Sequence, residues 1–572
     1  MTRAPSSRPR RSRKGWSAVR KHDPSPLLLA SGLKPDGVAR LLAPYGLTDL
    51  KLADANLQSM AGEPRTRLLL AKFLGELLGM LARTADPDQG LNHWERFLQA
   101  GLNRSQILDY LGGNPRMLHL LCTIFGNSPS MAQTLIRDPL LVYWLAEQQV
   151  LTRRPSRDML AASLRMMLGN VKAAELQLDA LRRFRRREML RIGIRDLLRM
   201  ADVRETTAAL TDLACVLIHA AYEIAGAGLN QEYGRPRHKD SSGRLVETGF
   251  AVIAMGKLGG GELNFSSDVD LLFVYASDSG TTAQAGRAGA RDSSRGISNE
   301  EYFERLARAI TKALADVTQE GHVFRVDLRL RAEGTSGQLA RSLDRYAQYY
   351  RTRGEQWERM ALLKAWPVAG DRSVGEAFLS RISPFIYDGM DAHAPEAILA
   401  QIKAVKDMID AKMAGRGQEH RNVKLGRGGI REIEFIVQAA QILFGGRLPD
   451  LRDRSTMGAL ERMARHRLLS STDRRALERA YVFLRDVEHK LQMVHDLQTH
   501  ALPESPDELA RCAIRLGYDP VDRRAAGRKF LSDHRRHTAN VHRIFKNLFN
   551  APARSALVKA ARSQKKRVAN SE

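Results

Sequence analysis

The segment from Met255 to Tyr275 constrains the fold of this chain more than any other part of the sequence. It reads Met-Gly-Lys-Leu-Gly-Gly-Gly-Glu-Leu-Asn-Phe-Ser-Ser-Asp-Val-Asp and continues into the apolar run Leu-Leu-Phe-Val-Tyr. Side chains alternate between the two faces of a β-strand, so Asp268 and Asp270 are predicted on one face and Val269 on the inner face. Two convergent carboxylates are ligands that hard divalent cations such as Mg²⁺ select. The segment therefore predicts a metal-binding strand after a glycine-rich turn.

A third carboxylate is expected on a neighbouring strand. Residues 324–331 read Phe-Arg-Val-Asp-Leu-Arg-Leu-Arg, in which polar and apolar residues alternate strictly. This pattern predicts one strand face that carries Asp327, Arg329 and Arg331. Guanidinium groups pair well with phosphate, and a carboxylate beside them can hold a cation. The three aspartates together are typical of a nucleotidyltransferase active site.

The Asp-x-Asp, glycine-rich and arginine motifs each have another interpretation. An isolated Asp-x-Asp is common in surface turns, but here a Gly-Gly turn precedes it and an apolar strand contains it. A P-loop would require Ser or Thr after Lys257, where this chain has Leu258, and the dinucleotide fingerprint lacks its first half. A purely structural ion-pair role of Arg329 and Arg331 with the aspartates remains open.

At these residues the sequence resembles the glutamine synthetase adenylyltransferases, also called glutamate-ammonia-ligase adenylyltransferases. The resemblance spans most of residues 160 to 550 and includes segments 181–188, 326–337, 357–359, 363–365 and 424–438. Members of this family usually carry two polymerase-β-like nucleotidyltransferase domains, a deadenylylating N-terminal half and an adenylylating C-terminal half. This sequence has one copy of the motif. The residues at 262–267 and 429–432 resemble those of the deadenylylating half.

The resemblance implies an α+β fold, with a polymerase-β-like nucleotidyltransferase domain of mixed sheet flanked by largely α-helical regions. The implied reaction is phosphorolysis, in which inorganic phosphate and adenylyl-tyrosine give ADP and free tyrosine. Two Mg²⁺ ions held by Asp268, Asp270 and Asp327 suit such a displacement.

A set of glycine, hydroxyl and basic residues is expected to bind the nucleotide or phosphate: Gly259, Gly260, Ser267, Arg329, Arg331, Lys364 and Arg427. The amides of the two glycines, at a predicted helix start, would cradle the phosphodiester. Lys364 suits a solvated position equally well, and a tight turn alone would explain the glycines after Arg427. Glu432 and Glu434 lie two apart on a predicted helix, so they are expected to serve as salt-bridge or capping groups.

Two departures from the family pattern are apparent. Ala332 stands where a proline usually follows the Arg-Leu-Arg segment, and this change is expected to loosen the loop after it. Trp366 stands where an arginine is usual, which puts catalytic competence in question.

The resemblance implies adenylylated glutamine synthetase as the protein substrate and the PII signal protein as a candidate regulator. Cys122, Cys215 and Cys512 have no metal-ligand spacing, and they suit a reducing cytoplasm. No run approaches 18 consecutive apolar residues, so no membrane association is expected. The net charge is +26, but the first 22 and the last 22 residues hold half of it. No specific nucleic-acid partner is therefore expected.

The composition predicts five segments: a disordered basic tail at 1–22, an N-terminal helical region at 23–150, the nucleotidyltransferase domain at 151–375, a helical bundle at 376–550 and a second disordered basic tail at 551–572. Helices are expected at 66–82, 301–317, 396–413, 430–444, 471–497 and 527–548. The Ser/Gly/Arg-rich stretch 277–299 is expected to be a mobile loop that could touch a protein substrate.

Two other classes of function remain open from the sequence. A template-independent RNA nucleotidyltransferase, adding CCA or poly(A), shares the Gly-Gly and Asp-x-Asp site and would use the basic tails. A non-catalytic regulatory remnant would be expected to lose the carboxylates, which this chain keeps.

Overall fold

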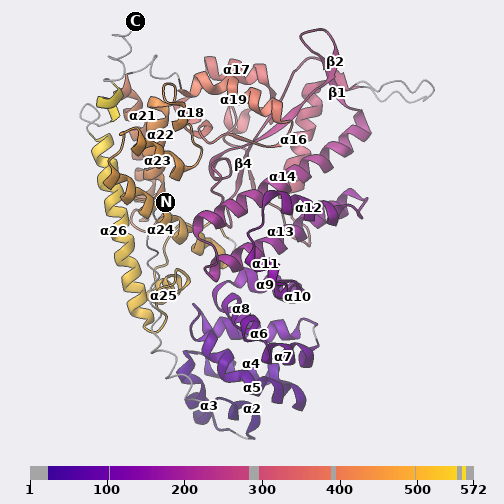
Figure 1. Ribbon diagram of the computed structural model, residues 1–572, viewed down its shortest axis with the longest axis vertical. Helices are drawn as coiled ribbons and strands as arrows, with labels where there is room; N and C mark the ends of the chain where they lie inside the picture. Colours follow the sequence, from indigo (N-terminus) through magenta and orange to yellow (C-terminus); the bar gives the residue numbers. More distant parts are fainter. Residues whose placement is uncertain are drawn as a thin grey trace, which may run out of the picture.

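The computed structural model describes residues 23–31, 33–101, 103–282, 296–387, 394–415, 417–495, 497–550 and 557–561. Helices predominate, and both sheets lie in the upper half of the molecule as drawn in Figure 1. The α+β fold expected from the sequence is confirmed.

The N-terminal part of the described chain is a stack of helices at the lower end of Figure 1. Asp86, Asn114 and Ser128 each accept a hydrogen bond from a first-turn amide, which ends the preceding loop and starts a helix. The helices are α2 (Pro26–Leu29), α3 (Pro35–Leu42), α4 (Leu50–Ala61), α5 (Pro64–Leu81), α6 (Pro87–Gln99), α7 (Arg104–Gly112), α8 (Pro115–Asn127), α9 (Pro129–Arg137), α10 (Leu141–Ala146), α11 (Gln148–Thr152) and α12 (Arg157–Leu168).

Two long helices, α13 (Ala174–Leu197) and α14 (Val203–Tyr233), connect this stack to the sheets. By length and composition α14 could cross a membrane, but 61% of its most apolar stretch is buried inside the molecule. It packs against α12, α13 and α16 (Asn299–Ala315) as a core helix. The apolar character of α14 is thus explained by burial within the fold.

The main sheet has five strands with order β6-β4-β3-β8, and β7 also pairs with β4. β3 runs antiparallel to β4 and β8, whereas β4 runs parallel to β6 and β7. The strands are β3 (Phe250–Ala254), β4 (Val269–Tyr275), β6 (Val326–Asp327), β7 (Ala340–Ser342) and β8 (Trp366–Gly370). A second, antiparallel sheet joins β1 (Pro236–Lys239), β2 (Leu245–Glu247) and β5 (Thr281–Thr282).

Both faces of the main sheet are buried, which explains why β3 and β4 are almost wholly apolar. Phe250, Val252 and Phe273 join one hydrophobic core. Ile253 and Leu272, which point the other way, join a second core. The sheet therefore holds the two cores of the molecule on either side, and the motif strand β4 is fixed between them.

Helices from the second half of the chain cover the second core. The long helix α26 runs along one side of the molecule and packs on four of the helices named below, α21, α22, α24 and α25 (Figure 1). These helices are α17 (Leu343–Thr352), α18 (Gln356–Leu362), α19 (Arg372–Tyr387), α21 (Pro395–Ala414), α22 (Ile430–Phe444), α23 (Thr456–Arg465), α24 (Ser471–His495), α25 (Pro506–Arg515) and α26 (Arg523–Phe549).

The helices expected from periodicity are present with small shifts at their ends, as α5, α16, α21, α22, α24 and α26. Two expectations need correction. The predicted strand at 324–331 ends after Asp327, because its carboxylate accepts the backbone N–H of Arg329 at 2.9 Å and starts a turn. Residues 557–561 of the predicted C-terminal tail form a helical turn that buries Leu557 and Val558.

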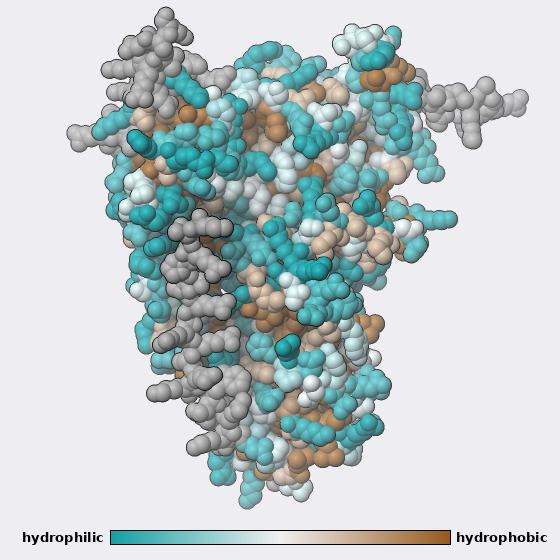
Figure 2. Space-filling model, viewed as in Figure 1, coloured by the Kyte–Doolittle hydropathy of each residue, from teal (hydrophilic) through white to brown (hydrophobic). Residues whose placement is uncertain are grey.

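Other predictions concern residues with no structural description. The basic tail at 1–22 and residues 283–295 of the predicted mobile loop lie outside the described residues. The described ends of that loop are held, since Thr281 and Ser298 form a β-bridge. The molecular face in Figure 2 is mainly hydrophilic, with apolar side chains in small separate groups.

The buried position of α14 leads to a stability prediction. Leu217 is fully buried on this helix, so Leu217→Ala is expected to lower the free energy of unfolding by about 2–5 kcal/mol through lost burial and a cavity. Urea denaturation followed by circular dichroism measures the change. The matched control is Leu176→Ala on α13, where the side chain is 57% exposed, and its effect should stay within about 0.5 kcal/mol. Equal effects of the two substitutions would contradict the placement of α14 in the core.

Candidate active site

Three aspartates lie at one end of two neighbouring parallel strands. The register of β4 and β6 sets Asp270 directly beside Asp327, and Asp268 precedes β4 by one residue. Val269 is fully buried between the two carboxylate positions. The sheet thus brings the predicted aspartates to one edge, where paired residues of neighbouring strands point to the same face.

The glycine-rich turn allows one of these carboxylates to lie close to the backbone. Gly256 adopts a left-handed φ of +54° at the start of the one-turn helix α15 (Gly256–Gly259). A Cβ atom at this position would lie 2.2 Å from Oδ2 of Asp270. Any larger residue would push the carboxylate away, so the glycine is required for both its backbone conformation and its small size.

Burial and neighbouring charges disfavour the ionised form of Asp270. Burial and, next, the charge of Asp327 raise the pKa of Asp270 to about 6, whereas Lys424 is the largest opposing influence. The carboxylates of Asp327 and Asp268 therefore repel a third negative charge at this point. A bound cation would stabilise such a group of carboxylates.

Arginine side chains hold the other two aspartates. Arg325 Nε donates to Asp268 Oδ1 at 2.7 Å, and Arg329 Nε donates to both carboxylate oxygens of Asp327 at 3.0 Å. The hydrogen bond from Arg329 is the main reason that the pKa of Asp327 is lowered. Within the described part of the chain, no three His, Cys, Asp or Glu side chains converge in a geometry suited to a metal ion. Two of the three aspartates are thus paired with arginines in this structure.

The amides of Gly259 and Gly260, predicted to bind phosphate, donate to backbone carbonyls in the structure. The amide of Gly259 donates to the Met255 carbonyl at 2.8 Å and that of Gly260 to the Gly256 carbonyl at 3.1 Å. A Cβ at Gly259 would lie 2.0 Å from the Lys364 carbonyl oxygen, so this glycine permits close backbone packing. Ser267 Oγ accepts the amide of Asn264 at 3.3 Å and stabilises the turn before β4. These three residues shape the site through the backbone.

Arg331 and Lys364 also have protein partners. Arg331 is buried and donates to the carbonyls of Leu328, Thr335 and Gly337 at 2.7, 3.0 and 3.1 Å. It therefore fastens the loop after β6 from within. Ala332, where the family usually has proline, is itself fully buried beside this arginine. We assign Arg331 a structural role in place of phosphate contact.

Lys364 is the centre of a buried ionic cluster. Its Nζ donates to Glu262 Oε2 at 3.2 Å and to Glu434 Oε1 at 3.1 Å. Tyr481 Oη also donates to Glu262 Oε2, at 2.9 Å. Burial opposes the charged form of Lys364, but the two carboxylates outweigh it and raise its pKa. Its charge is thus used within the protein, and phosphate contact is not supported.

The two glutamates at the start of α22 behave as expected from their spacing. Glu434 pairs with Lys364 and Arg431, which hold its pKa at about 2 although burial alone would raise it. Glu432 pairs with Lys406 and His542 at 3.2 Å. Their predicted salt-bridge role is confirmed.

Sequence reasoning missed three basic residues near the carboxylates. Lys257, in the glycine-rich turn, donates to Glu488 Oε1 at 2.7 Å, and burial lowers its pKa to about 7. Both Lys257 and Lys424 oppose the rise in the pKa of Asp270. Arg325 binds Asp268. Each of them lies inside a motif that the sequence analysis names: Lys257 in 255–275, Arg325 in 324–331 and Lys424 in 424–438.

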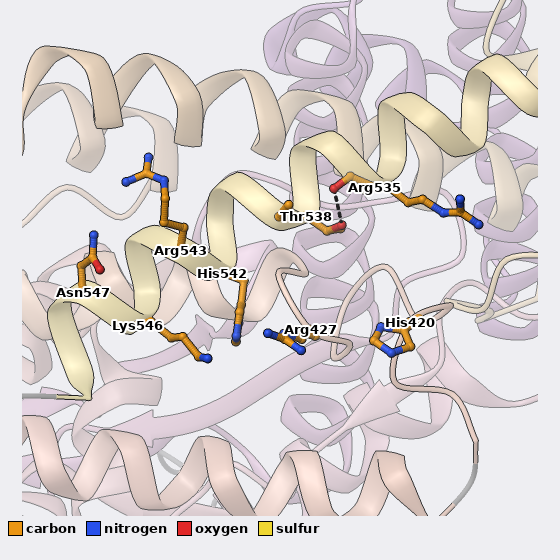
Figure 3. Close-up of a pocket in the computed structure, with 9 residues that line it drawn as sticks. His420, Arg427, Arg535, Thr538, His542, Arg543, Lys546 and Asn547 are labelled. Atoms are coloured by element: carbon orange, nitrogen blue, oxygen red, sulfur yellow. Dashed lines mark hydrogen bonds between the residues drawn. The ribbon is translucent and has the colours of Figure 1, made fainter.

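Trp366 and Arg427, both discussed from the sequence, lie among other basic residues. Trp366, in place of the usual arginine, lies on β8 with the guanidinium of Arg454 4.2 Å from its ring centroid and that of Arg157 at 5.6 Å. Positive charge is therefore retained around this position by other residues. Arg427 is exposed and lines a pocket against α26 (Figure 3), to which neither β4 nor β6 contributes a residue.

The ionic cluster predicts a large stability effect. Lys364→Ala would leave Glu262 and Glu434 buried without their cation, and we expect it to lower the free energy of unfolding by about 3–5 kcal/mol. Thermal and urea unfolding measure this change. The control Lys312→Ala removes an exposed pair with Asp316 and should cost less than about 0.5 kcal/mol. Wild-type stability of Lys364→Ala, combined with weaker phosphate binding, would contradict the structural role.

The raised pKa of Asp270 predicts a pH-dependent effect. Its folded pKa lies above the ordinary value of 3.8, so ionisation destabilises the folded protein as pH rises. With excess EDTA, Asp270→Asn is expected to be more stable than the wild type by about 1–3 kcal/mol above pH 6. This advantage should shrink towards pH 4, where the wild-type carboxyl is protonated. Unfolding curves across this pH range check it, and an advantage independent of pH would contradict the assignment.

Comparisons with known proteins show which family this chain is similar to. Residues 118–381 match the family profile described as glutamate-ammonia ligase adenylyltransferase, and residues 403–549 match that of the GlnD PII-uridylyltransferases. A bifunctional glutamine synthetase adenylyltransferase/adenylyl-removing enzyme from Nitrosococcus oceani is 38% identical over 438 residues, which cover 76% of this chain and 43% of that protein. The protein of the same name from Rhizobium meliloti is 42% identical over 342 residues, 59% of this chain and 33% of that protein.

The chain thus spans less than half the length of the curated relatives that it matches. The matched region 118–381 contains the glycine-rich turn, β4 with its two aspartates, and β6 with the third. From the sheet geometry and these similarities together, the chain belongs to the glutamate-ammonia ligase adenylyltransferase family of nucleotidyltransferases.

Proposed function

We propose that this chain removes adenylyl groups from glutamine synthetase by phosphorolysis. An oxygen of inorganic phosphate forms a bond to the adenylyl phosphorus, the bond from phosphorus to the tyrosine oxygen breaks, and ADP leaves. The tyrosine oxygen takes up a proton. The observation that carries the proposal is the in-register pair Asp270 and Asp327 on parallel strands, with Asp268 beside them.

The three aspartates fit a divalent cation. They offer hard oxygen donors, and both burial and the neighbouring Asp327 raise the pKa of Asp270, so a cation beside this carboxylate would be stabilised. We therefore propose that Asp268, Asp270 and Asp327 hold Mg²⁺, most simply two ions. When bound, these ions would supply positive charge to the reacting phosphate oxygens and the leaving tyrosine oxygen. Arg325 and Arg329 would release the carboxylates that they pair with.

Basic residues around the aspartates suit an anionic substrate. Arg329 is an exposed arginine at the strand end, with 75% of its side chain accessible, so it can turn from Asp327 to a phosphate. Lys257 and Lys424 carry positive charge close to Asp270. Attack of phosphate on a phosphodiester brings two anions together, and these cations would lower the repulsion between them.

The direction of the reaction rests on the residues that resemble the deadenylylating half. Glu262 and Asn264 in that motif are held by helix α24, where Arg485 donates to Asn264 Oδ1 at 2.6 Å and Tyr481 donates to Glu262. The relatives are named for both adenylylation and adenylyl removal, and the resemblance at 262–267 and 429–432 leads us to assign this chain the second activity. A cytoplasmic location and regulation by the PII signal protein belong to the same proposal, in keeping with the PII-uridylyltransferase similarity of residues 403–549.

The proposal predicts phosphate-dependent ADP release from adenylylated glutamine synthetase in the presence of Mg²⁺. Asp270→Asn is expected to lower the rate by about a hundredfold or more, because a metal ligand at the reacting centre is lost. Coupled enzymatic detection of ADP measures the rate. The matched control Asp344→Asn changes an exposed carboxylate that pairs with Arg381, and its rate should equal that of the wild type.

Three results would contradict this function. Folded protein that releases no ADP would favour a non-catalytic regulatory role. An ADP release that Asp270→Asn leaves unchanged would exclude the carboxylate centre. Incorporation of labelled nucleotide into RNA, dependent on Asp270, would favour a template-independent RNA nucleotidyltransferase.

A further inference from the structure

A basic pocket lies between helix α26 and the loop that precedes α22. Its volume is about 460 Å³, and nine residues line it. Four of them are the cations Arg427, Arg535, Arg543 and Lys546, and two are the histidines His420 and His542. None of the nine is acidic. A concentration of positive charge in a concave site is a feature of anion-binding sites.

The charges in the pocket are only partly neutralised by the protein. Arg543 pairs with Asp473 at 3.1 Å, and His542 pairs with Glu432 at 3.2 Å. Neither Arg427 nor Lys546 has an ion-pair partner among the residues that the structure describes. In Figure 3 the side chains of Arg427 and Lys546 point towards each other on either side of His542. Their ammonium and guanidinium groups therefore repel one another unless an anion lies between them.

The loop that carries Arg427 is held in place. Gly428 has a φ of +71°, and a Cβ on it would lie 2.0 Å from the Thr538 carbonyl oxygen of α26. The amide of Arg427 donates to the Glu419 carbonyl at 2.9 Å, and Asn422 Oδ1 accepts the amides of Lys424 and Leu425. The backbone that presents Arg427 to α26 is thus fixed before any ligand binds, which lowers the entropic cost of binding.

We propose that this pocket binds the phosphate groups of a mononucleotide. Arginine and lysine donate charge-assisted hydrogen bonds to phosphate oxygens. The pocket is far larger than one phosphate needs, since a water molecule occupies about 30 Å³, and its volume lies in the range of about 300–1,000 Å³ typical of small-ligand sites. The ring of His420 offers a flat surface on which a base can stack.

This pocket is separate from the aspartate centre, because none of its lining residues comes from β4 or β6. The binding of a nucleotide in this pocket does not depend on the proposed reaction.

Isothermal titration of the full chain with ADP, in EDTA and without Mg²⁺, tests the proposal. Saturable binding of one ADP is expected, with AMP and inorganic phosphate binding more weakly. Loss of one charge-assisted contact corresponds to roughly tenfold in affinity, so Arg427→Ala and Lys546→Ala should each weaken ADP binding about tenfold. Arg528→Ala, an exposed arginine on α26 that does not line the pocket, should bind as the wild type does.

Asp270→Asn separates this site from the aspartate centre, and in EDTA it should bind ADP with wild-type affinity. The proposal would be overturned by absence of ADP binding, by wild-type affinity of both pocket variants, or by loss of binding in Asp270→Asn. Binding of inorganic phosphate as tight as that of ADP would overturn the assignment to a nucleotide. Tighter binding of single-stranded RNA, weakened by the same two substitutions, would assign the pocket to nucleic acid. Circular dichroism of each variant establishes that it is folded.

Discussion

The ion pairs of Lys364 with Glu262 and Glu434 connect three parts of the chain that are distant in sequence. Glu262 follows the glycine-rich turn, Lys364 precedes β8, and Glu434 belongs to α22. Charges buried in this way cost energy to desolvate, and they are tolerated when each has a well-placed partner. The cluster therefore fixes the turn against the helices of the second half of the chain. The position of Asp270 depends on this turn through Gly256.

The aspartate centre is built with the opposite balance of charge. Asp268 and Asp327 have arginine partners, whereas Asp270 lies half-buried on β4 with its pKa raised to about 6. A rigid frame thus holds a carboxylate in an unfavourable position, a common arrangement at functional sites. The frame explains how a strand between two apolar cores can present negative charge at its end. A cation and an anionic substrate together would relieve this imbalance.

Local patterns predicted the elements that periodicity and composition determine. The apolar run of β4 and the periodic faces of α5, α22 and α24 allowed these elements to be placed correctly. The alternation at 324–331 predicted a strand that is too long. The hydrogen bond from the Arg329 amide to Asp327 ends β6, and the sequence pattern does not reveal this bond. The partners of Lys364 were out of reach for the same reason, since Glu262 and Glu434 are distant in the sequence. Gly259 and Gly260 indicated a tight backbone turn, but the sequence did not show that the backbone of Lys364 packs against it.

The central claim is that Asp268, Asp270 and Asp327 form one cation site. Mn²⁺ is a suitable substitute for Mg²⁺, because both prefer oxygen ligands. The most direct measurement is the anomalous diffraction of crystals grown with Mn²⁺ and ADP. The account predicts an anomalous peak coordinated by Asp270 and Asp327, with Arg329 turned away from Asp327. A peak elsewhere in the molecule, with the arginine pairs intact and the strand end empty, would contradict it.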